Sequence, residues 1–300
     1  MVDGVSFDVW GTIFGDAFFS EIEEHYTEYT GTSRTEIAQS MQRAYEVLRE
    51  KRKEGAIGKG IDPVAYSLEL LEPFGVNIDA FKNAMAAALI SIDIEKLLMP
   101  GMREAIEELY KDHALVILGN VVYWPGAYTR ALISKAGLSK FFRAQLYSDE
   151  IGCAKPSREA FSKALSLLGI TDPRRAAHVG DNFYEDFCGA IGSNFHAVML
   201  TRDITQTTVI GGNAFVRDAS QLPLTIRGLR GQGQSAPLSA NPGLIGRFAK
   251  APLLFSWAKA KGKAVEVKRR PETRVCWKLS KQVCAKTAAR STCLSPCSGS

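Results

Sequence analysis

The stretch "VSFDVWGT", residues 5–12, decides how the rest of the chain is interpreted. The short apolar run from Val5 to Phe7 predicts a strand, and Asp8 and a Gly-Thr turn follow it. Trp10 stands two residues beyond the acid, where a second carboxylate would be able to exchange protons with a substrate. The stretch therefore offers Asp8 either as a nucleophile without a proton partner or as a turn residue at the end of a strand.

The periodicity of the chain changes near Pro100-Gly101. Residues 16–98 repeat apolar side chains every three or four positions, which predicts a small bundle of helices inserted just after the first strand. Beyond residue 101, short apolar strands alternate with amphipathic helices, which predicts an α/β fold with a doubly wound parallel sheet. The expected strands are "ALVIL", "AQLY", "AAHV" and "HAVML", with "AFVRD" near 214–218 as a last edge strand.

Polar residues follow these strands where each strand ends. Asp8 follows the first strand, Asn120 follows Gly119 after "ALVIL", and Asp181 follows "AAHV" and a glycine. Lys155 stands in the loop after "AQLY". Because ligands bind outside the carboxyl ends of the strands in an open parallel sheet, these side chains are expected to meet in one crevice.

Four motifs in this order resemble those of the haloacid dehalogenase superfamily, whose members are hydrolases with an aspartate nucleophile. They are "FDVWGT", "VILGN", "CAKP" and "VGDNFYEDFCGA", and the resemblance covers roughly residues 4–225. It implies a Rossmann-like core with an inserted α-helical cap. The expected domains are a core at 1–15 and 99–229, a cap at 16–98, and a basic C-terminal extension at 230–300.

The resemblance also implies a reaction. Asp8 would attack the phosphoryl group of a small phosphorylated metabolite and form an aspartyl phosphate. Mg²⁺ would be held by the Asp8 carboxylate, the backbone carbonyl of Trp10 and Asp181. Asp186 would serve as an alternative metal ligand, or would orient Lys155 or metal-bound water.

The remaining site residues are expected to contact the substrate. Lys155 would offset the negative charge of nucleophile and phosphate, while Asn120 and the Gly119 N–H would hold phosphate oxygens. Trp10 and Gly119 depart from the family pattern, which usually has an acid and a hydroxyl residue there. Loss of a general acid–base typically costs about 10²–10⁴-fold in rate.

An alternative function follows from Trp10, since 2-haloacid dehalogenases carry an aromatic residue at this position and need no metal. The acidic pair Asp181 and Asp186 favours the Mg²⁺-dependent phosphatase, because neighbouring carboxylates repel one another without a counter-ion. A protein that binds phosphate or a partner without turnover is the third alternative.

Each site residue also has a purely structural alternative. Asp8 would cap a turn, and Lys155 would be a solvated loop lysine. Asp186 would suit a helix dipole, and Trp10 would be a wedge between core and cap. His178 is expected to lie in the core or behind the site.

Composition sets the remaining expectations. The net charge of +5 is uneven, because residues 230–300 hold 14 basic and 2 acidic residues against 23 and 30 in 1–229. This basic segment is expected to be flexible, with weak contact to a polyanion or membrane surface as its alternative role. Only Cys153 and Cys188 lie in 1–229, so no disulfide framework is expected and the cytoplasm is the expected location. No pattern in the sequence indicates an oligomeric state.

Overall fold

The structure, a computed structural model, describes residues 1–55, 57 and 60–229. The predicted contacts of residues 230–300 with a polyanion or a membrane lie outside the described residues. Within the described ranges, no helix has the length and apolar character needed to cross a membrane.

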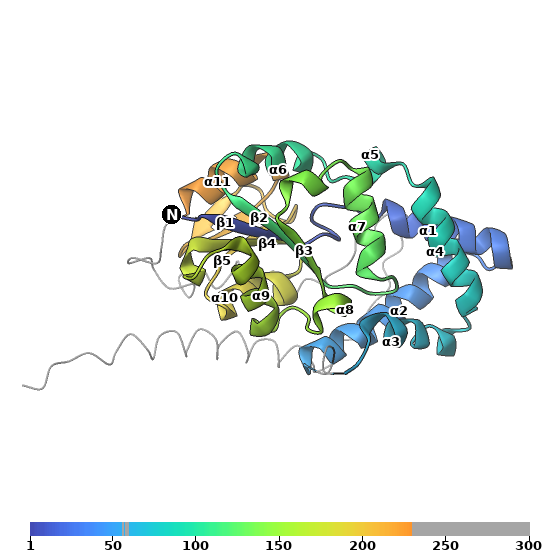
Figure 1. Ribbon diagram of the computed structural model, residues 1–300. Coiled ribbons are helices and arrows are strands. Elements are labelled where there is room, and N and C mark those ends of the chain that lie inside the picture. The colour runs from blue at the N-terminus through green and yellow to red at the C-terminus, as the bar shows by residue number, and fades with distance from the viewer. Residues whose placement is uncertain (56, 58–59, 230–300) are drawn as a thin grey trace, which may run out of the picture. The chain divides into compact units, whose positions relative to one another are not determined.

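A seven-stranded sheet in the order β3-β2-β1-β4-β5-β7-β6 forms the centre of the described part of the chain (Figure 1). Every neighbouring pair is parallel except β6 and β7, which are antiparallel. This arrangement confirms the predicted α/β fold. The strands are β1 (Gly4–Phe7), β2 (Ala114–Gly119), β3 (Ala144–Tyr147), β4 (Ala176–Gly180), β5 (His196–Leu200), β6 (Thr208–Ile210) and β7 (Asn213–Val216).

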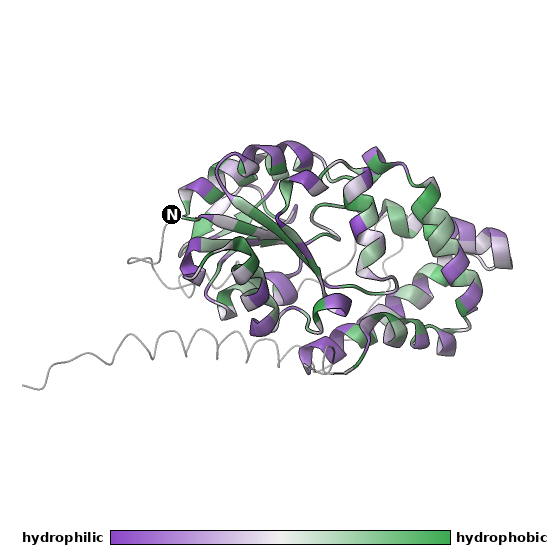
Figure 2. Cartoon of the chain, in the orientation of Figure 1, coloured by the Kyte–Doolittle hydropathy of each residue, from purple (hydrophilic) through white to green (hydrophobic). Residues whose placement is uncertain are grey.

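Helices cover both faces of this sheet (Figure 1). On one face lie α6 (Met102–Tyr110) and α11 (Leu222–Gly228), and on the other lie α9 (Arg158–Leu168) and α10 (Gly189–Gly192). The central strands are buried on both sides: Val5 and Phe7 of β1 point to one face and Ser6 to the other, and all three are fully buried. Figure 2 shows the same pattern, with hydrophobic residues on the strands and hydrophilic residues on the outer helices.

The helical insert follows β1 and precedes α6, as predicted. Within the insert, helices α1 and α4 pack against each other. Local signals start the helices: Ser33 and Glu36 form a capping box at α2, and Asn77 caps α4. The exact boundaries of core and cap remain predictions. The helices of the insert are α1 (Ala17–Thr30), α2 (Arg34–Lys53), α3 (Pro63–Glu69), α4 (Ile78–Ser91) and α5 (Ile94–Leu97).

Two details of the predicted core were wrong. The "AFVRD" segment is not the edge strand, because β7 lies between β5 and β6. The edge strand β6 has only three residues and joins β7 through Gly211-Gly212, both with positive φ, as a two-residue hairpin turn requires. The sequence between "AAHV" and "HAVML" predicts one helix at 184–192, whereas the structure divides this segment into a π-helix, η4 (Phe183–Cys188), and the short α10.

Helix α1 of the insert carries a buried carboxyl group at Glu23. One of its oxygens, Oε1, is buried without a hydrogen-bond partner, and Oε2 lies 3.8 Å from Nη2 of Arg34. Burial raises the pKa of Glu23 from 4.5 to about 7, although Arg34 opposes the shift. Ionisation of Glu23 therefore opposes folding.

Glu23→Gln is expected to stabilise the protein at pH 8 but not at pH 4. The unfolded chain loses the Glu23 proton near its ordinary pKa of 4.5, whereas the folded protein holds it up to about pH 7. The wild type thus loses stability as pH rises between these values, and the variant does not. Urea unfolding at several pH values measures the difference. Glu24→Gln, at the exposed neighbouring position, is the control and should show no such pH trend.

Candidate functional site

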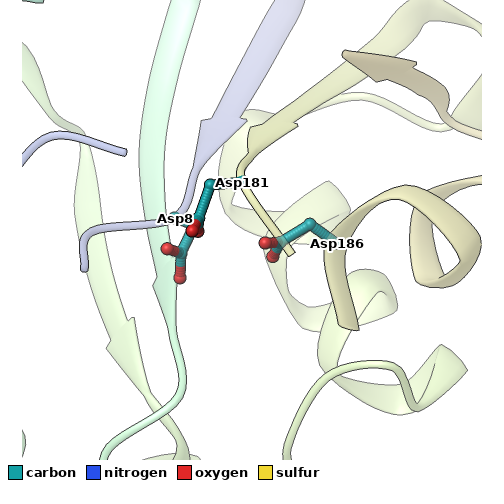
Figure 3. Close-up of side chains that lie close together, drawn as sticks. All are labelled: Asp8, Asp181 and Asp186. Carbon is teal, nitrogen blue, oxygen red and sulfur yellow. The ribbon is translucent and has the colours of Figure 1, made fainter. Parts of the chain in front are cut away.

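Three aspartates lie together at the carboxyl end of the central strands. Asp8 follows β1 and Asp181 follows β4, and these two strands pair with Phe7 opposite Val179. Asp186 comes from η4, and one oxygen of each carboxylate lies within 4.8 Å of the other two. Figure 3 shows the Asp8 and Asp181 side chains close to each other, with Asp186 beside them. The sheet order reverses at β1, so the cluster lies at the topological switch point.

Two glycines make room for these carboxylates. A Cβ on Gly11 would lie 2.3 Å from Oδ2 of Asp181, and a Cβ on Gly180 would lie 2.2 Å from Cγ of Asp186. Gly11 also has a φ of +90°, a conformation that other residues rarely adopt. The backbone therefore approaches the acids more closely than any side-chain-bearing residue would allow.

Lys155 supplies the compensating charge. Its Nζ donates to Oδ1 of Asp8 and to Oδ1 of Asp186, both at 2.6 Å, and the residue is 1% exposed. Burial alone would lower the pKa of Lys155, but the charges of Asp186 and Asp8 outweigh it and hold the pKa above its ordinary value. The ammonium is therefore charged at neutral pH.

Asp186 is held at three points, one of which is its contact with Lys155. Besides the lysine, it accepts hydrogen bonds from Nε2 of His178 at 3.0 Å and from the backbone N–H of Asn182 at 2.9 Å. Burial would raise the pKa of Asp186, but Lys155 and His178 hold it below its ordinary value. On its other side the His178 ring pairs with Oγ of Ser6 at 2.8 Å. The prediction that His178 lies in the core behind the site agrees with this geometry.

Asp8 and Asp181 carry the uncompensated charge. Burial, together with the charge of Asp186, raises the pKa of Asp8 to about 7 although Lys155 opposes the shift. Burial and the neighbouring Asp8 also raise the pKa of Asp181 above its ordinary value. When all three carboxylates are ionised, the one ammonium leaves a net negative charge that a bound cation would offset, and hard carboxylate oxygens are the ligands that Mg²⁺ prefers. The donor set thus fits a divalent cation.

Asn120 lies beside Lys155 and grips its backbone. Its Oδ1 accepts from the Lys155 N–H at 2.9 Å, and its Nδ2 donates to the Lys155 carbonyl at 3.0 Å. The neighbouring Gly119 has a reason to lack a side chain, because its Cβ would lie 3.2 Å from the ring of Tyr147. The predicted contacts of Asn120 and Gly119 with phosphate stay predictions.

Trp10 packs in an aromatic cluster between core and insert. Its ring centroid lies 5.0 Å from that of Trp124, 5.6 Å from Phe18 and 5.7 Å from Phe19. Phe18 and Phe19 belong to α1, so the packing joins the loop after β1 to the helical insert. The ring packing agrees with the predicted wedge between core and cap, and the predicted contact of Trp10 with substrate stays a prediction.

The sequence did not reveal several residues of this site. The space-making roles of Gly11 and Gly180 and the contact of Thr12 Oγ1 with Asp8 at 3.4 Å depend on the folded backbone. The Gly-Asp pairing at 180–181 was a usable signal for one glycine, because a glycine before a strand-end acid often marks a close backbone approach.

Comparison with known proteins identifies the family. A model of the haloacid dehalogenase-like hydrolases matches residues 2–191. Pyrimidine 5'-nucleotidase YjjG of Escherichia coli is 26% identical over 204 residues, which are 66% of this chain and 85% of that protein. Pyrophosphatase PpaX of Listeria monocytogenes is 37% identical over 86 residues, but these cover only 28% of this chain and 38% of that protein.

Solved structures support the fold. The putative hydrolase YfnB of Bacillus subtilis, bound to magnesium, has a TM-score of 0.58 at 17% identity and covers 75% of this chain and 98% of its own. L-2-haloacid dehalogenase of Xanthobacter autotrophicus has a TM-score of 0.58 at 20% identity and covers 77% and 100%. At these identities the likeness concerns the fold alone.

Gly11→Ala is expected to weaken binding of a divalent cation by about tenfold or more. Substitution of residues that orient metal ligands typically has an effect of this size. The new methyl group would displace Asp181 from the cluster. Isothermal titration with Mg²⁺ measures the effect. Gly15→Ala on the same loop is the control, since its Cβ would meet nothing closer than Met99 Sδ at 3.5 Å. Equal affinity in the two variants would contradict the role given to Gly11.

Proposed function

Because the chain belongs to the haloacid dehalogenase-like hydrolase family, we propose that it is a Mg²⁺-dependent phosphatase that acts on a small phosphorylated metabolite. The observation that carries this proposal is the charge balance, in which a cluster of three carboxylates contains one lysine, bound to Asp8 and Asp186. An enzyme that uses no cation would gain nothing from the additional charge of Asp181. The phosphatase and nucleotidase names of its relatives support phosphorylated substrates. A cytoplasmic location is part of the same proposal, and the low cysteine content of residues 1–229 supports it.

Asp8, Asp181 and the Trp10 carbonyl would hold the Mg²⁺, with Asp186 next to them. When bound, the cation would neutralise the charge that carboxylates and phosphate bring together. Asp186 is the weakest candidate ligand, because its oxygens already accept from Lys155, His178 and Asn182. Its role is to hold Lys155 in place.

Asp8 is the proposed nucleophile. Its carboxylate would attack phosphorus in line, so that a bond forms between Asp8 and phosphorus while the bond to the leaving group breaks. Lys155, within 2.6 Å of Asp8, would offset the charge of the phosphoryl oxygens as they approach. Water would then attack the aspartyl phosphate, release inorganic phosphate and regenerate the Asp8 carboxylate. Trp10 supplies no proton, so the leaving group would take its proton from water.

A 2-haloacid dehalogenase is the second candidate, and Trp10 is the observation in its favour. A halide leaving group needs no proton, so an aromatic side chain suffices where a phosphatase usually has an acid. The Asp181 carboxylate weighs against this reading, for the reason given above. A phosphate- or partner-binding protein without turnover is the third candidate.

Phosphate release from a panel of phosphomonoesters is expected to require both Mg²⁺ and Asp8. Asp8→Asn keeps the shape of the side chain but removes the nucleophile, so turnover should fall to background, as it should with a chelator. Asp3→Asn, which alters a surface ion pair with Arg175, is the control and should keep wild-type activity. No release from any ester, together with halide release from a 2-haloacid, would establish the second candidate instead.

Trp10→Asp is expected to hydrolyse alkyl phosphates at least about tenfold faster than Trp10→Asn, since general acid–base catalysis contributes about 10²–10⁴-fold. Both variants lose the same aromatic contacts of Trp10, so the comparison isolates proton transfer. The kcat on an alkyl phosphate, normalised to the folded fraction, is the measurement. Equal rates would show that position 10 does not face the leaving group.

A further inference from the structure

An arginine of the insert, Arg52, lies buried against the catalytic end of the core. It belongs to the last turn of α2 and is only 4% exposed. Its Nη1 donates to Oε1 of Glu185 at 3.3 Å, and its Nη2 donates to the backbone carbonyl of Val121. Both partners belong to the core, on η4 and on the loop after β2. Because the guanidinium group is rigid and binds two groups of the core, Arg52 fixes the end of α2 against the core.

Glu185 is connected to the backbone of Lys155 through Asn120. Its second oxygen, Oε2, accepts from Nδ2 of Asn120 at 2.7 Å. That same amide group of Asn120 grips both the N–H and the carbonyl of Lys155, at 2.9 Å and 3.0 Å. A continuous chain of hydrogen bonds therefore runs from the insert through Glu185 and Asn120 to the backbone of Lys155.

Arg52 is the cation that faces the Glu185 carboxylate. Glu185 is 5% exposed and directly precedes Asp186 in the sequence. Arg52 is its only ion-pair partner among the described residues. A buried carboxylate that loses its partner must find water or move, because an unpaired charge is costly away from solvent. Either response would release the Asn120 amide.

The loop after β2 is bound to the insert at three consecutive residues. Besides the Val121 carbonyl, the Val122 carbonyl accepts from Oγ of Ser67 at 2.6 Å, and the hydroxyl of Tyr123 donates to the Met41 carbonyl. Asn120 immediately precedes these three residues. The insert thus fixes the loop that contains Asn120, which hydrogen-bonds to the backbone of Lys155.

We propose that Arg52 and Glu185 are positioning residues, through which the helical insert holds Lys155 against Asp8. Neither residue contacts the carboxylate cluster by a hydrogen bond, so both act through Asn120. The core by itself would leave Glu185 unpaired and Asn120 loosely held. The position of Lys155 in the catalytic site therefore depends on the insert, independently of any contact between the insert and the substrate. The effect on turnover rests on the proposed function, whereas the effect on Lys155 does not.

Amide hydrogen exchange at Lys155 tests the structural part without activity or metal. Arg52→Gln is expected to speed exchange of the Lys155 N–H at least about tenfold, because Asn120 Oδ1 would no longer be held against it. Lys51→Gln is the matched control, since it removes one charge from the adjacent, more exposed position, where Lys51 pairs with Glu54. Exchange at Lys155 that is unchanged in a folded Arg52→Gln protein overturns the proposal.

Steady-state kinetics tests the catalytic part. Arg52→Gln should lower kcat at least about tenfold and change KM less than about threefold, as expected for a group that orients a catalytic residue without binding substrate. Arg52→Lys, which keeps the charge but cannot reach both partners, should fall between. In Arg52→Gln/Glu185→Gln the loss should be smaller than the product of the single losses, since no unpaired charge remains. Multiplicative losses, or a change in KM alone, would overturn the positioning role.

The two proposals fail in different ways. If the wild type hydrolyses no phosphate ester, the proposed function fails, but fast exchange at Lys155 in Arg52→Gln still supports the link. If the wild type is active and Arg52→Gln matches Lys51→Gln in both exchange and kcat, the link fails and the proposed function stands. Circular dichroism and the Tm of each variant confirm that a folded protein is being compared.

Discussion

The buried ammonium of Lys155 is the interaction on which the site depends. It lies between Asp8 and Asp186, 2.6 Å from each, and no other described lysine is buried to this degree. Buried carboxylates repel one another, so without this charge the acids could not remain together at the end of the sheet. The single lysine does not neutralise all three acids, and the remainder is what makes the cluster fit a divalent cation.

The surrounding fold can be understood from the needs of that lysine. Asp186 must stay ionised, and His178, Asn182 and a missing Cβ at Gly180 hold it in place. The Lys155 backbone must stay fixed, and Asn120 holds it on both sides. A parallel sheet brings these groups together, because the loops after β1, β2, β3 and β4 all lie at the carboxyl end of the strands.

Much of this arrangement was predictable from the sequence, because a parallel sheet turns strand order into spatial order. Asp8, Asn120, Lys155 and Asp181 each follow a recognisable apolar run, so their meeting needed no knowledge of side-chain contacts. The edge hairpin was missed although Gly211-Gly212 marked it, since a strand of three residues gives almost no periodic signal. The π-helix at 183–188 was taken for part of an ordinary helix, because its hydrogen-bond pattern leaves no trace in polarity.

The contacts that the sequence could not predict join distant segments through single side chains. Arg52 and Glu185 are separated by 133 positions, and nothing in "REKRKEG" distinguishes the buried arginine from its exposed neighbours. Similarly, no motif indicated that the Asn120 amide bonds to Lys155 and Glu185, and its predicted contact with phosphate stays a prediction. Such side chains satisfy both hydrogen bonding and charge only in the finished structure, so pattern alone does not separate them from solvated ones.

Trp10 adds aromatic packing at the position where the family usually has an acid. An acid there would need solvent or a polar partner, yet the position is surrounded by Phe14, Phe18, Phe19 and Trp124 with ring centroids 5.0–5.7 Å away. Aromatic pairs of this kind contribute about 0.5–1.5 kcal/mol each beyond the area they bury. The same residue therefore strengthens the contact between core and insert that Arg52 also uses. In this protein the insert is tied to the catalytic end of the sheet by apolar packing on one side and by a buried ion pair on the other. Under the proposed function, Trp10 stands where a proton donor is usual. The rate would therefore depend on how readily the leaving group departs without a proton from the enzyme.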